Sequence, residues 1–266
     1  MWEGIIARMH SDGVSQSLSM HSENVAEISN DISHYPNTSK LLAYLHDLGK
    51  LSTDFQNYIR NGGERGSVPH AWQGAFLINE LIADDCTSSI LLKEIVGFCI
   101  TAHHNHLSNG VNPDGTNEYF NKYLNKNDRK YSFEDIKGKI TKQEQAVLQA
   151  LFDNAKPEID SLLTKVNKVY KDRDSAKFAL GLFVKYLFSC LVDADRLDAY
   201  FSGAVYLCEK SRKKFLSSWQ NRKKEEIMHP FLKEKVEWGL VPYCQALMLV
   251  RTIRGDLDNY PPFLWK

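Results

Sequence analysis

The sequence predicts a mostly α-helical, all-α fold. Apolar residues recur at helical rather than alternating intervals in six stretches, and two polar stretches rich in turn-forming residues interrupt this pattern. The composition, 43% hydrophobic and 25% charged, is typical of a globular protein. The helical stretches are SENVAEISNDI, KLLAYLHDLGKL, AWQGAFLINELI, ILLKEIVGFCITAHH, KQEQAVLQALFD and AKFALGLFVKYLFSCLVDADRLDAYF.

The length of 266 residues lies within the range of one large domain, so we expect a single domain over residues 1–266. No G-x-x-x-x-G-K-[ST] phosphate-binding loop occurs, and we therefore expect no helicase domain. The 33 basic and 33 acidic side chains balance, which excludes a global basic field of the kind that drives nonspecific duplex binding.

Cysteine usage and the N-terminal residues predict the cellular compartment. The five cysteines are far apart, odd in number and form no C-x-x-C pair, so they suggest neither a disulfide framework nor a structural zinc site. The first residues, MWEGIIARMHSDG, become polar too early for a signal peptide, and no apolar run approaches the length of a membrane span. We expect a soluble cytoplasmic protein with no membrane partner.

The two polar stretches differ in length. Residues 61–70, NGGERGSVPH, are expected to connect two helices. Residues 108–132 could form a lid, an exposed insertion or a mobile loop, and the last two are favoured.

Five of the nine histidines accompany helical apolar runs, and one of them is followed directly by an aspartate and, one turn later, by a lysine. Adjacent residues on a helix diverge by about 100°. His46 and Asp47 could therefore straddle one helix face and bind one metal ion or two neighbouring ions, with Lys50 on the same face. The residues concerned are His21, His46, His70, His103, His104, Asp47 and Lys50.

A single histidine beside a helical core is more often a hydrogen-bonded structural residue than a ligand. We favour that interpretation for His10, His34, His106 and His229, which belong to no repeated pattern. For the His46–Asp47 pair alone the two interpretations are nearly balanced, because a dipeptide is a weak motif. The ordered series of histidines and aspartates favours metal binding.

That series resembles the HD superfamily of metal-dependent phosphohydrolases. It is most similar to the CRISPR-associated nuclease branch, the HD domain that works with a DNA helicase in type I interference. The stretches that carry the resemblance are LSMHSENVAEI, YLHDLGKLSTDFQ, PHAWQGA, TAHHN and LVDADRLDA, and they span about residues 18–200. The resemblance implies an HD-domain helical bundle around a histidine and aspartate metal site, followed by a helical extension over residues 201–266.

By resemblance, His21, His46, Asp47 and a late aspartate look like ligands of one metal. Asp47 would bridge to a second metal held by His70, His103 and His104, and Lys50 looks like the residue that meets the phosphate. Imidazole and carboxylate without thiolate suit divalent manganese, iron, cobalt or nickel better than a magnesium-only site, although magnesium is compatible. The expected cofactor is one or two such ions.

The late aspartate has two candidates, Asp193 and Asp195, which point to different sides of a helix. Asp195 continues the stripe of Leu180, Val184, Phe188 and Leu191, whereas Asp193 continues the stripe of Tyr186, Ser189 and Cys190. We prefer Asp195, because the more apolar stripe is expected to face the core.

The resemblance implies a metal-dependent endonuclease that hydrolyses phosphodiester bonds of single-stranded DNA in CRISPR antiviral defence. Its implied partners are a helicase, as a subunit or a fused domain, and through it an RNA-guided surveillance complex. Two alternatives stay open: an HD phosphohydrolase acting on nucleotides or cyclic dinucleotides, and a non-catalytic binding domain.

Two clusters give weak independent support for a nucleic-acid substrate. Lysine and arginine surround Phe215 and Trp219 in residues 209–226, which could form a strand-binding groove but more often form a solvated amphipathic helix. Tyr119, Phe120 and Tyr123 have the same two interpretations.

Overall fold

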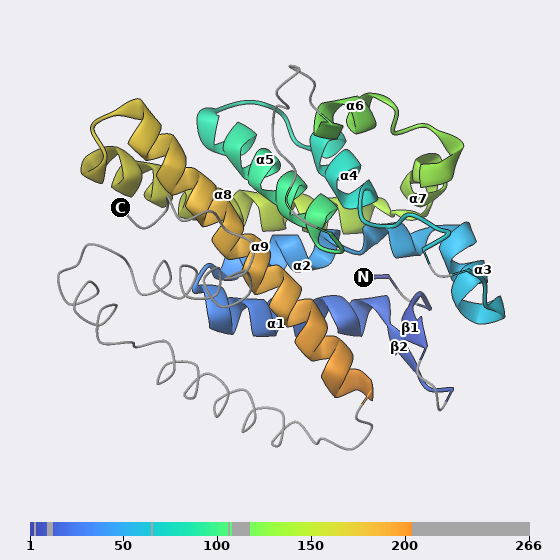
Figure 1. Ribbon diagram of the computed structural model, residues 1–266. Helices are drawn as coiled ribbons and strands as arrows, with labels where there is room; N and C mark the ends of the chain where they lie inside the picture. The colour runs from blue at the N-terminus through green and yellow to red at the C-terminus, as the bar shows by residue number, and fades with distance from the viewer. Residues whose placement is uncertain (3, 10–12, 65, 106, 108–117, 204–266) are drawn as a thin grey trace, which may run out of the picture. The chain divides into compact units, whose positions relative to one another are not determined.

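The computed structural model describes residues 1–203 apart from residues 3, 10–12, 65, 106 and 108–117 (Figure 1). The chain divides into two units, Met1–Gly203 and Ala204–Lys266, where the sequence analysis expects one domain with an extension from residue 201. His10, His106, His229 and the basic stretch 209–226 lie outside the described residues, so those predictions stay untested.

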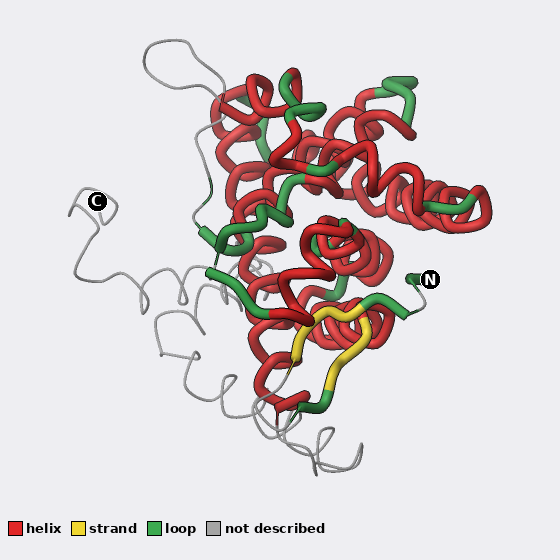
Figure 2. Tube along the Cα trace, turned by 90° about the vertical axis from the view of Figure 1, so that its right-hand side faces the viewer, coloured by secondary structure: helices red, strands yellow, loops and turns green. Residues whose placement is uncertain are grey.

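The described part is mostly α-helical, as predicted (Figure 2). A short antiparallel β-hairpin at its start was not predicted, nor were α3, α6 and α7. The elements, in chain order, are β1 (Ile6–Met9), β2 (Ser15–Ser17), α1 (Leu18–Ser33), α2 (Pro36–Leu45), the 3-10 helix η1 (Leu48–Leu51), α3 (Thr53–Asn61), α4 (Gln73–Leu81), α5 (Thr87–Ala102), α6 (Glu118–Leu124), the 3-10 helix η2 (Arg129–Tyr131), α7 (Phe133–Lys139), α8 (Lys142–Val169) and α9 (Arg173–Gly203).

Four helices enclose the core around α2 and α5 (Figure 1). Helix α1 packs on α2 and α9, α2 also packs on α8, and α5 contacts α4, α8 and α9. Leu42, Phe76, Val96 and Leu187 are fully buried in these interfaces. Each such side chain contributes about 1.5–3 kcal/mol through its removal from water.

Side-chain caps fix the helices that carry the site. Ser17 accepts a hydrogen bond from the Met20 amide and begins α1. The carboxylate of Glu158, on α8, accepts from the amides of Asn37 and Thr38 in the first turn of α2. Because these amides have no partner within their own helix, Glu158 stabilises the N-terminus of α2 and ties it to α8.

The helix predicted over residues 40–51 is interrupted at its middle. Helix α2 ends at Leu45, His46 is its C-cap, and Asp47 precedes η1. A Cβ atom at Gly49 would collide with the backbone of His70, and one at Gly74 would collide with the Leu45 carbonyl. The two glycines therefore allow the segment before α4 to pack directly against this turn.

Helix α9 corrects one expectation from the sequence. Its residues Arg173–Ala199 are long and apolar enough to cross a membrane by length and composition, although a core helix of a soluble protein passes the same test. Here α9 packs on α1 and α5.

The described end of the long polar stretch contains α6 and η2. The ring of Tyr123 lies 6.2 Å from that of Phe76, and the Lys126 ammonium lies 4.6 Å from the Tyr123 ring. Tyr123, on α6, therefore takes part in an aromatic cluster around Phe76 of α4. The side chains of Tyr119 and Phe120 lie outside the described part.

Candidate metal centre

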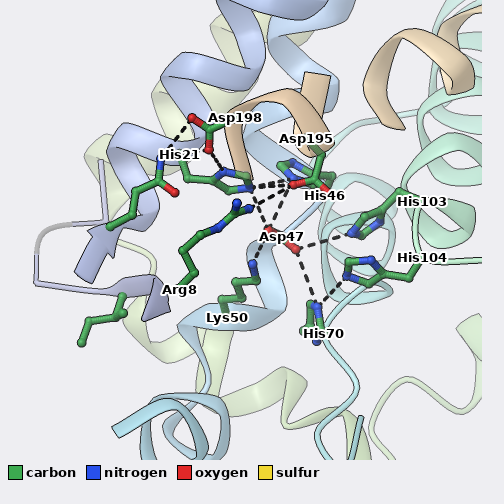
Figure 3. Close-up of polar contacts among 12 residues, drawn as sticks. Arg8, His21, His46, Asp47, Lys50, His70, His103, His104, Asp195 and Asp198 are labelled. Atoms are coloured by element: carbon green, nitrogen blue, oxygen red, sulfur yellow. Dashed lines mark hydrogen bonds and ion pairs between the residues drawn. The ribbon is translucent and has the colours of Figure 1, made fainter. Parts of the chain in front are cut away.

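The predicted site residues converge on the carboxylate of Asp47, which is 2% exposed (Figure 3). They arrive from segments far apart in the sequence. His21 comes from α1, His46 and Asp47 from the end of α2, Lys50 from η1, His70 from the segment before α4, His103 and His104 from the end of α5, and Asp195 from α9.

One group of donor atoms surrounds Oδ2 of Asp47. Nε2 of His21 lies 3.0 Å from this oxygen and 3.1 Å from Nε2 of His46. Oδ1 of Asp195 lies 3.4 Å from the same His21 nitrogen. The donor atoms of these four residues lie within 4.8 Å of one another, which suits a single metal ion.

A second group lies at the other oxygen, Oδ1 of Asp47. Nε2 of His70 lies 3.8 Å from this oxygen and 2.7 Å from Nε2 of His104. These three residues form a second compact donor set. Nε2 of His103 is 3.5 Å from Oδ1, but His103 is not part of that compact set. The geometry therefore gives His103 a less direct place than the resemblance implied.

Hydrogen bonds on the far side of the rings determine which nitrogen faces the centre. Nδ1 of His46 donates to the Ala43 carbonyl at 2.8 Å, and Nδ1 of His70 donates to the Val68 carbonyl at 3.2 Å. A carbonyl oxygen only accepts, so each neutral ring carries its hydrogen on Nδ1. The free lone pair of Nε2 then points toward Asp47, as in metal-binding histidines.

His103 follows the same rule, since its Nδ1 donates to the Ile100 carbonyl. Its Nε2 and Oδ1 of Asp47 are buried and have no hydrogen-bond partner among the described residues. Leaving buried polar atoms unsatisfied costs about 1–3 kcal/mol each. A cation near both atoms would remove that cost.

His21 has a carboxylate partner instead of a carbonyl. Its Nδ1 donates to Oδ2 of Asp198 at 2.6 Å, so in the neutral ring Nε2 carries no hydrogen and presents a lone pair. When both rings are neutral, the Nε2 atoms of His21 and His46 face each other at 3.1 Å with no hydrogen between them. Two facing lone pairs repel, and a bound cation turns this contact into a favourable one. The residues present fit a divalent metal ion.

The electrostatics of Asp47 and His46 match the protonation states that metal binding requires. Burial raises the pKa of Asp47, but the Lys50 ammonium and His46 outweigh it and hold that pKa well below its usual value. Burial lowers the pKa of His46 to about 4. Near neutral pH the carboxylate is therefore charged and the imidazole neutral, as ligands must be.

Asp198 contacts the cluster and was not singled out from the sequence. Gln16 and Asn24 donate to its carboxylate, which is 2% exposed. Burial lowers the pKa of His21, but hydrogen bonds to Asp198 and Asp47 outweigh it and raise that pKa. The available signal was spacing, because Asp198 lies three residues after Asp195 and hence on the same helix face.

The structure places Asp195 in the first donor group, whereas Asp193 belongs to neither group of described residues. The argument from apolar stripes holds only in part. Leu191 in the Asp195 stripe is buried, but Val184 and Phe188 are half-buried. In the Asp193 stripe, Tyr186 and Cys190 are buried. Asp195 reaches the cluster from the border of the buried face, with its side chain 18% exposed.

Two cations touch the carboxylates. Nζ of Lys50 lies 2.6 Å from Oδ2 of Asp47, and Nη2 of Arg8, on β1, lies 3.3 Å from Oδ1 of Asp195. Arg8 was not singled out from the sequence. His34, for which we favoured a structural role, ends α1 in the left-handed conformation and belongs to neither donor group.

No protein-family model matches this chain. Part of it is similar to CRISPR-associated endonucleases. It is 58% identical over 74 residues to "CRISPR-associated endonuclease Cas1 2" of Rhodospirillum rubrum, which covers 28% of this chain and 21% of that protein. It is 45% identical over 75 residues to "CRISPR-associated endonuclease Cas1 1" of Chlorobaculum tepidum, covering 28% and 22%.

A further relative is the "CRISPR-associated exonuclease Cas4/endonuclease Cas1 fusion" of Geobacter sulfurreducens, 29% identical over 63 residues, covering 24% of this chain and 11% of that protein. The chain thus spans about a fifth or less of these relatives. His21 and Asp198 lie 177 positions apart, so no match of this length includes the whole cluster.

Proposed function

We propose that the unit Met1–Gly203 is a metal-dependent phosphodiesterase of the HD type that cleaves DNA as part of a CRISPR system. One observation carries the proposal. A buried, charged carboxylate, Asp47, lies between two groups of imidazoles, and the neutral rings of His21, His46 and His70 turn an Nε2 lone pair toward it. Lys50 pairs with Oδ2 of this carboxylate, but Oδ1 has no hydrogen-bond partner among the described residues, and a buried polar atom without a partner is costly.

Divalent ions bound in such a centre lower the pKa of a coordinated water to near neutrality and polarise a phosphoryl oxygen. His21, His46, Asp47 and Asp195 would hold one ion, and Asp47 with His70 and His104 would hold the other. The donor set of nitrogen and oxygen favours manganese, iron, cobalt or nickel.

Hydrolysis forms a bond between the water oxygen and phosphorus and breaks the bond from phosphorus to the leaving oxygen, which takes a proton. Negative charge grows on the phosphoryl oxygens during this exchange. The Lys50 ammonium, fixed 2.6 Å from Asp47 and 7% exposed, would be positioned to stabilise it. In comparable sites one such contact contributes about 3–4 kcal/mol.

The substrate and partners rest on the sequence resemblance. It supports single-stranded DNA as the substrate, a helicase as the partner and an RNA-guided surveillance complex reached through that helicase. The cysteine usage supports action in the cytoplasm. The similarity of part of the chain to CRISPR-associated endonucleases supports the CRISPR setting.

The proposal is tested with metal-stripped full-length protein and a labelled single-stranded oligonucleotide. Manganese, nickel, cobalt, magnesium and calcium are added back singly, with a duplex as a second substrate. We expect metal-dependent cutting of the single strand by the wild type and by Asp160→Ala, a control that removes an exposed carboxylate on α8. The Asp47→Ala variant should cut neither substrate.

Cutting by Asp47→Ala at the wild-type rate would refute the site. Turnover of mononucleotides or cyclic dinucleotides, without cutting of DNA, would establish the phosphohydrolase alternative. Metal binding without hydrolysis of any phosphoester would establish the non-catalytic alternative.

A further inference from the structure

The geometry points to Arg8 as a second phosphate-binding residue of this centre, delivered by the N-terminal β-hairpin. This inference rests on the proposed function and deepens it, because it states how the site would hold the anionic part of its substrate. Arg8 and Lys50 approach the carboxylates from the same side, away from His103 and His104 (Figure 3).

The register of the hairpin aims two side chains at one turn of α9. Arg8 on β1 pairs directly with Gln16 on β2, and paired residues of antiparallel strands project from the same face. Arg8 contacts Asp195 at 3.3 Å, and Gln16 donates to both oxygens of Asp198 at 3.1 and 2.9 Å. The hairpin thus contacts the two aspartates that lie one helical turn apart.

The hairpin is also tied to the segment that carries Lys50. The side chain of Gln56, on α3, accepts from the Ile6 amide at 3.1 Å and donates to the Ile6 carbonyl at 2.9 Å. The same amide group donates to the Lys50 carbonyl at 2.8 Å. Because Gln56 is buried, it fixes the backbone of the hairpin relative to that of Lys50. The backbone segments that carry the two cations are therefore linked through Gln56.

Arg8 occupies a position that a metal ion would compete for. Its guanidinium binds Oδ1 of Asp195, the same atom that lies 3.4 Å from Nε2 of His21. Once that oxygen binds an ion, it carries less charge for Arg8. A guanidinium has five N–H donors and matches the oxygens of a phosphate in pairs. With its side chain 19% exposed, Arg8 remains accessible to a substrate.

A purely structural role would have a different signature. An arginine that only braces Asp195 would support the metal site, and its removal would weaken metal binding. A phosphate-binding arginine competes with the metal for Asp195, so its removal leaves metal binding equal or tighter and weakens binding of the anion. The two roles are thus separated by two affinities measured on the same variant.

The experiment uses full-length protein with Arg8→Gln, Arg8→Lys and, as a control, Arg60→Gln. Arg60 is an exposed arginine on α3 whose side chain contacts the Gly4 carbonyl, next to the hairpin. Titration calorimetry measures the affinity of metal-stripped protein for manganese, and then of the manganese-loaded protein for inorganic phosphate, which is not hydrolysed. Cutting of a single-stranded oligonucleotide is measured in parallel.

We expect Arg8→Gln to bind manganese at least as tightly as the wild type, to bind phosphate about tenfold more weakly and to show a raised KM. Arg8→Lys should recover part of the phosphate affinity, since it restores the charge without the paired donors. Arg60→Gln should match the wild type.

Weaker manganese binding by Arg8→Gln with unchanged phosphate affinity would overturn the inference and make Arg8 a brace. The inference would also be overturned if the wild type cuts DNA and Arg8→Gln binds phosphate as tightly as the wild type does. Failure of the wild type to cut any oligonucleotide would instead refute the proposed nuclease. In that case the phosphate titration still shows whether the Arg8 side chain binds phosphate.

Discussion

Replacement of Asp198 by asparagine tests how the protein prepares His21 for metal binding. Asn24 donates to Oδ1 of Asp198 at 2.7 Å, Gln16 donates to both oxygens, and His21 donates to Oδ2. An asparagine side chain keeps one acceptor and gains one donor. To accept from Asn24 and Gln16, its oxygen must take the place of Oδ1, which leaves the amide nitrogen facing Nδ1 of His21.

The asparagine would then donate to Nδ1 of His21, so the hydrogen of that ring would move to Nε2. The Nε2 atom would point a hydrogen, instead of a lone pair, at the metal position. Loss of such a partner behind a metal-binding histidine typically costs tenfold to hundredfold in metal affinity. This loss corresponds to about 1.4–2.8 kcal/mol.

Calorimetric titration of manganese into metal-stripped Asp198→Asn measures this loss, with a thermal melt to verify that the variant folds. Asp193→Asn, on the same helix and outside both donor groups, is the matched control. Unchanged manganese affinity in Asp198→Asn, or an equal loss in Asp193→Asn, would refute the reasoning from the tautomer of His21.

Lys50→Ala should keep its metal and lose about a hundredfold to a thousandfold in the rate of hydrolysis, because charge near the phosphate is removed; Lys40→Ala, on the exposed face of α2, is the control, and loss of metal from Lys50→Ala would make that lysine structural. Gly49→Ala should unfold in urea with about 1–3 kcal/mol less free energy, since its Cβ meets the backbone of His70; a wild-type urea midpoint would contradict the close packing there. His46 has a folded-state pKa of about 4, below its value of 6.5 in the unfolded chain. Between pH 6.5 and 4 the His46 side chain is therefore protonated in the unfolded chain but neutral in the folded protein. The free energy of unfolding of the metal-free protein should fall by up to about 3 kcal/mol as the pH drops from 6.5 to 4. His46→Gln should give a flatter dependence in urea titrations over this range, and an equally steep one would show that other groups cause it.

The helices with a continuous apolar stripe could be predicted from the sequence, since their burial follows directly from helical period. Helix α3 could not, because Phe55 and Gln56 are its only buried residues. Helix α8 extends to Val169 beyond its predicted end at Asp153, through Pro157. A proline removes one backbone donor, but packing of the surrounding turns on α2 and α5 compensates for it.

The candidate site was predicted where its residues form local motifs, as in His46–Asp47 and His103–His104. Arg8 and Asp198 form no local motif with the residues that they contact. Arg8 reaches Asp195 across 187 positions, and Asp198 reaches His21 across 177. Such contacts depend on how the hairpin and α9 pack, which helical or alternating periodicity does not encode. The roles of all these residues as ligands remain predictions.

The central position of Asp47 has a consequence for the order in which the centre is filled. Its two oxygens face different groups of histidines, Oδ2 toward His21 and Oδ1 toward His70. An ion in the first group draws on the single negative charge of this carboxylate and repels a second ion across it. We therefore expect occupancy of the two groups to be negatively cooperative, so that a metal titration resolves into a tight step followed by a weaker one. A cell could set the number of ions in the centre, and with it the activity, through the concentration of free metal alone.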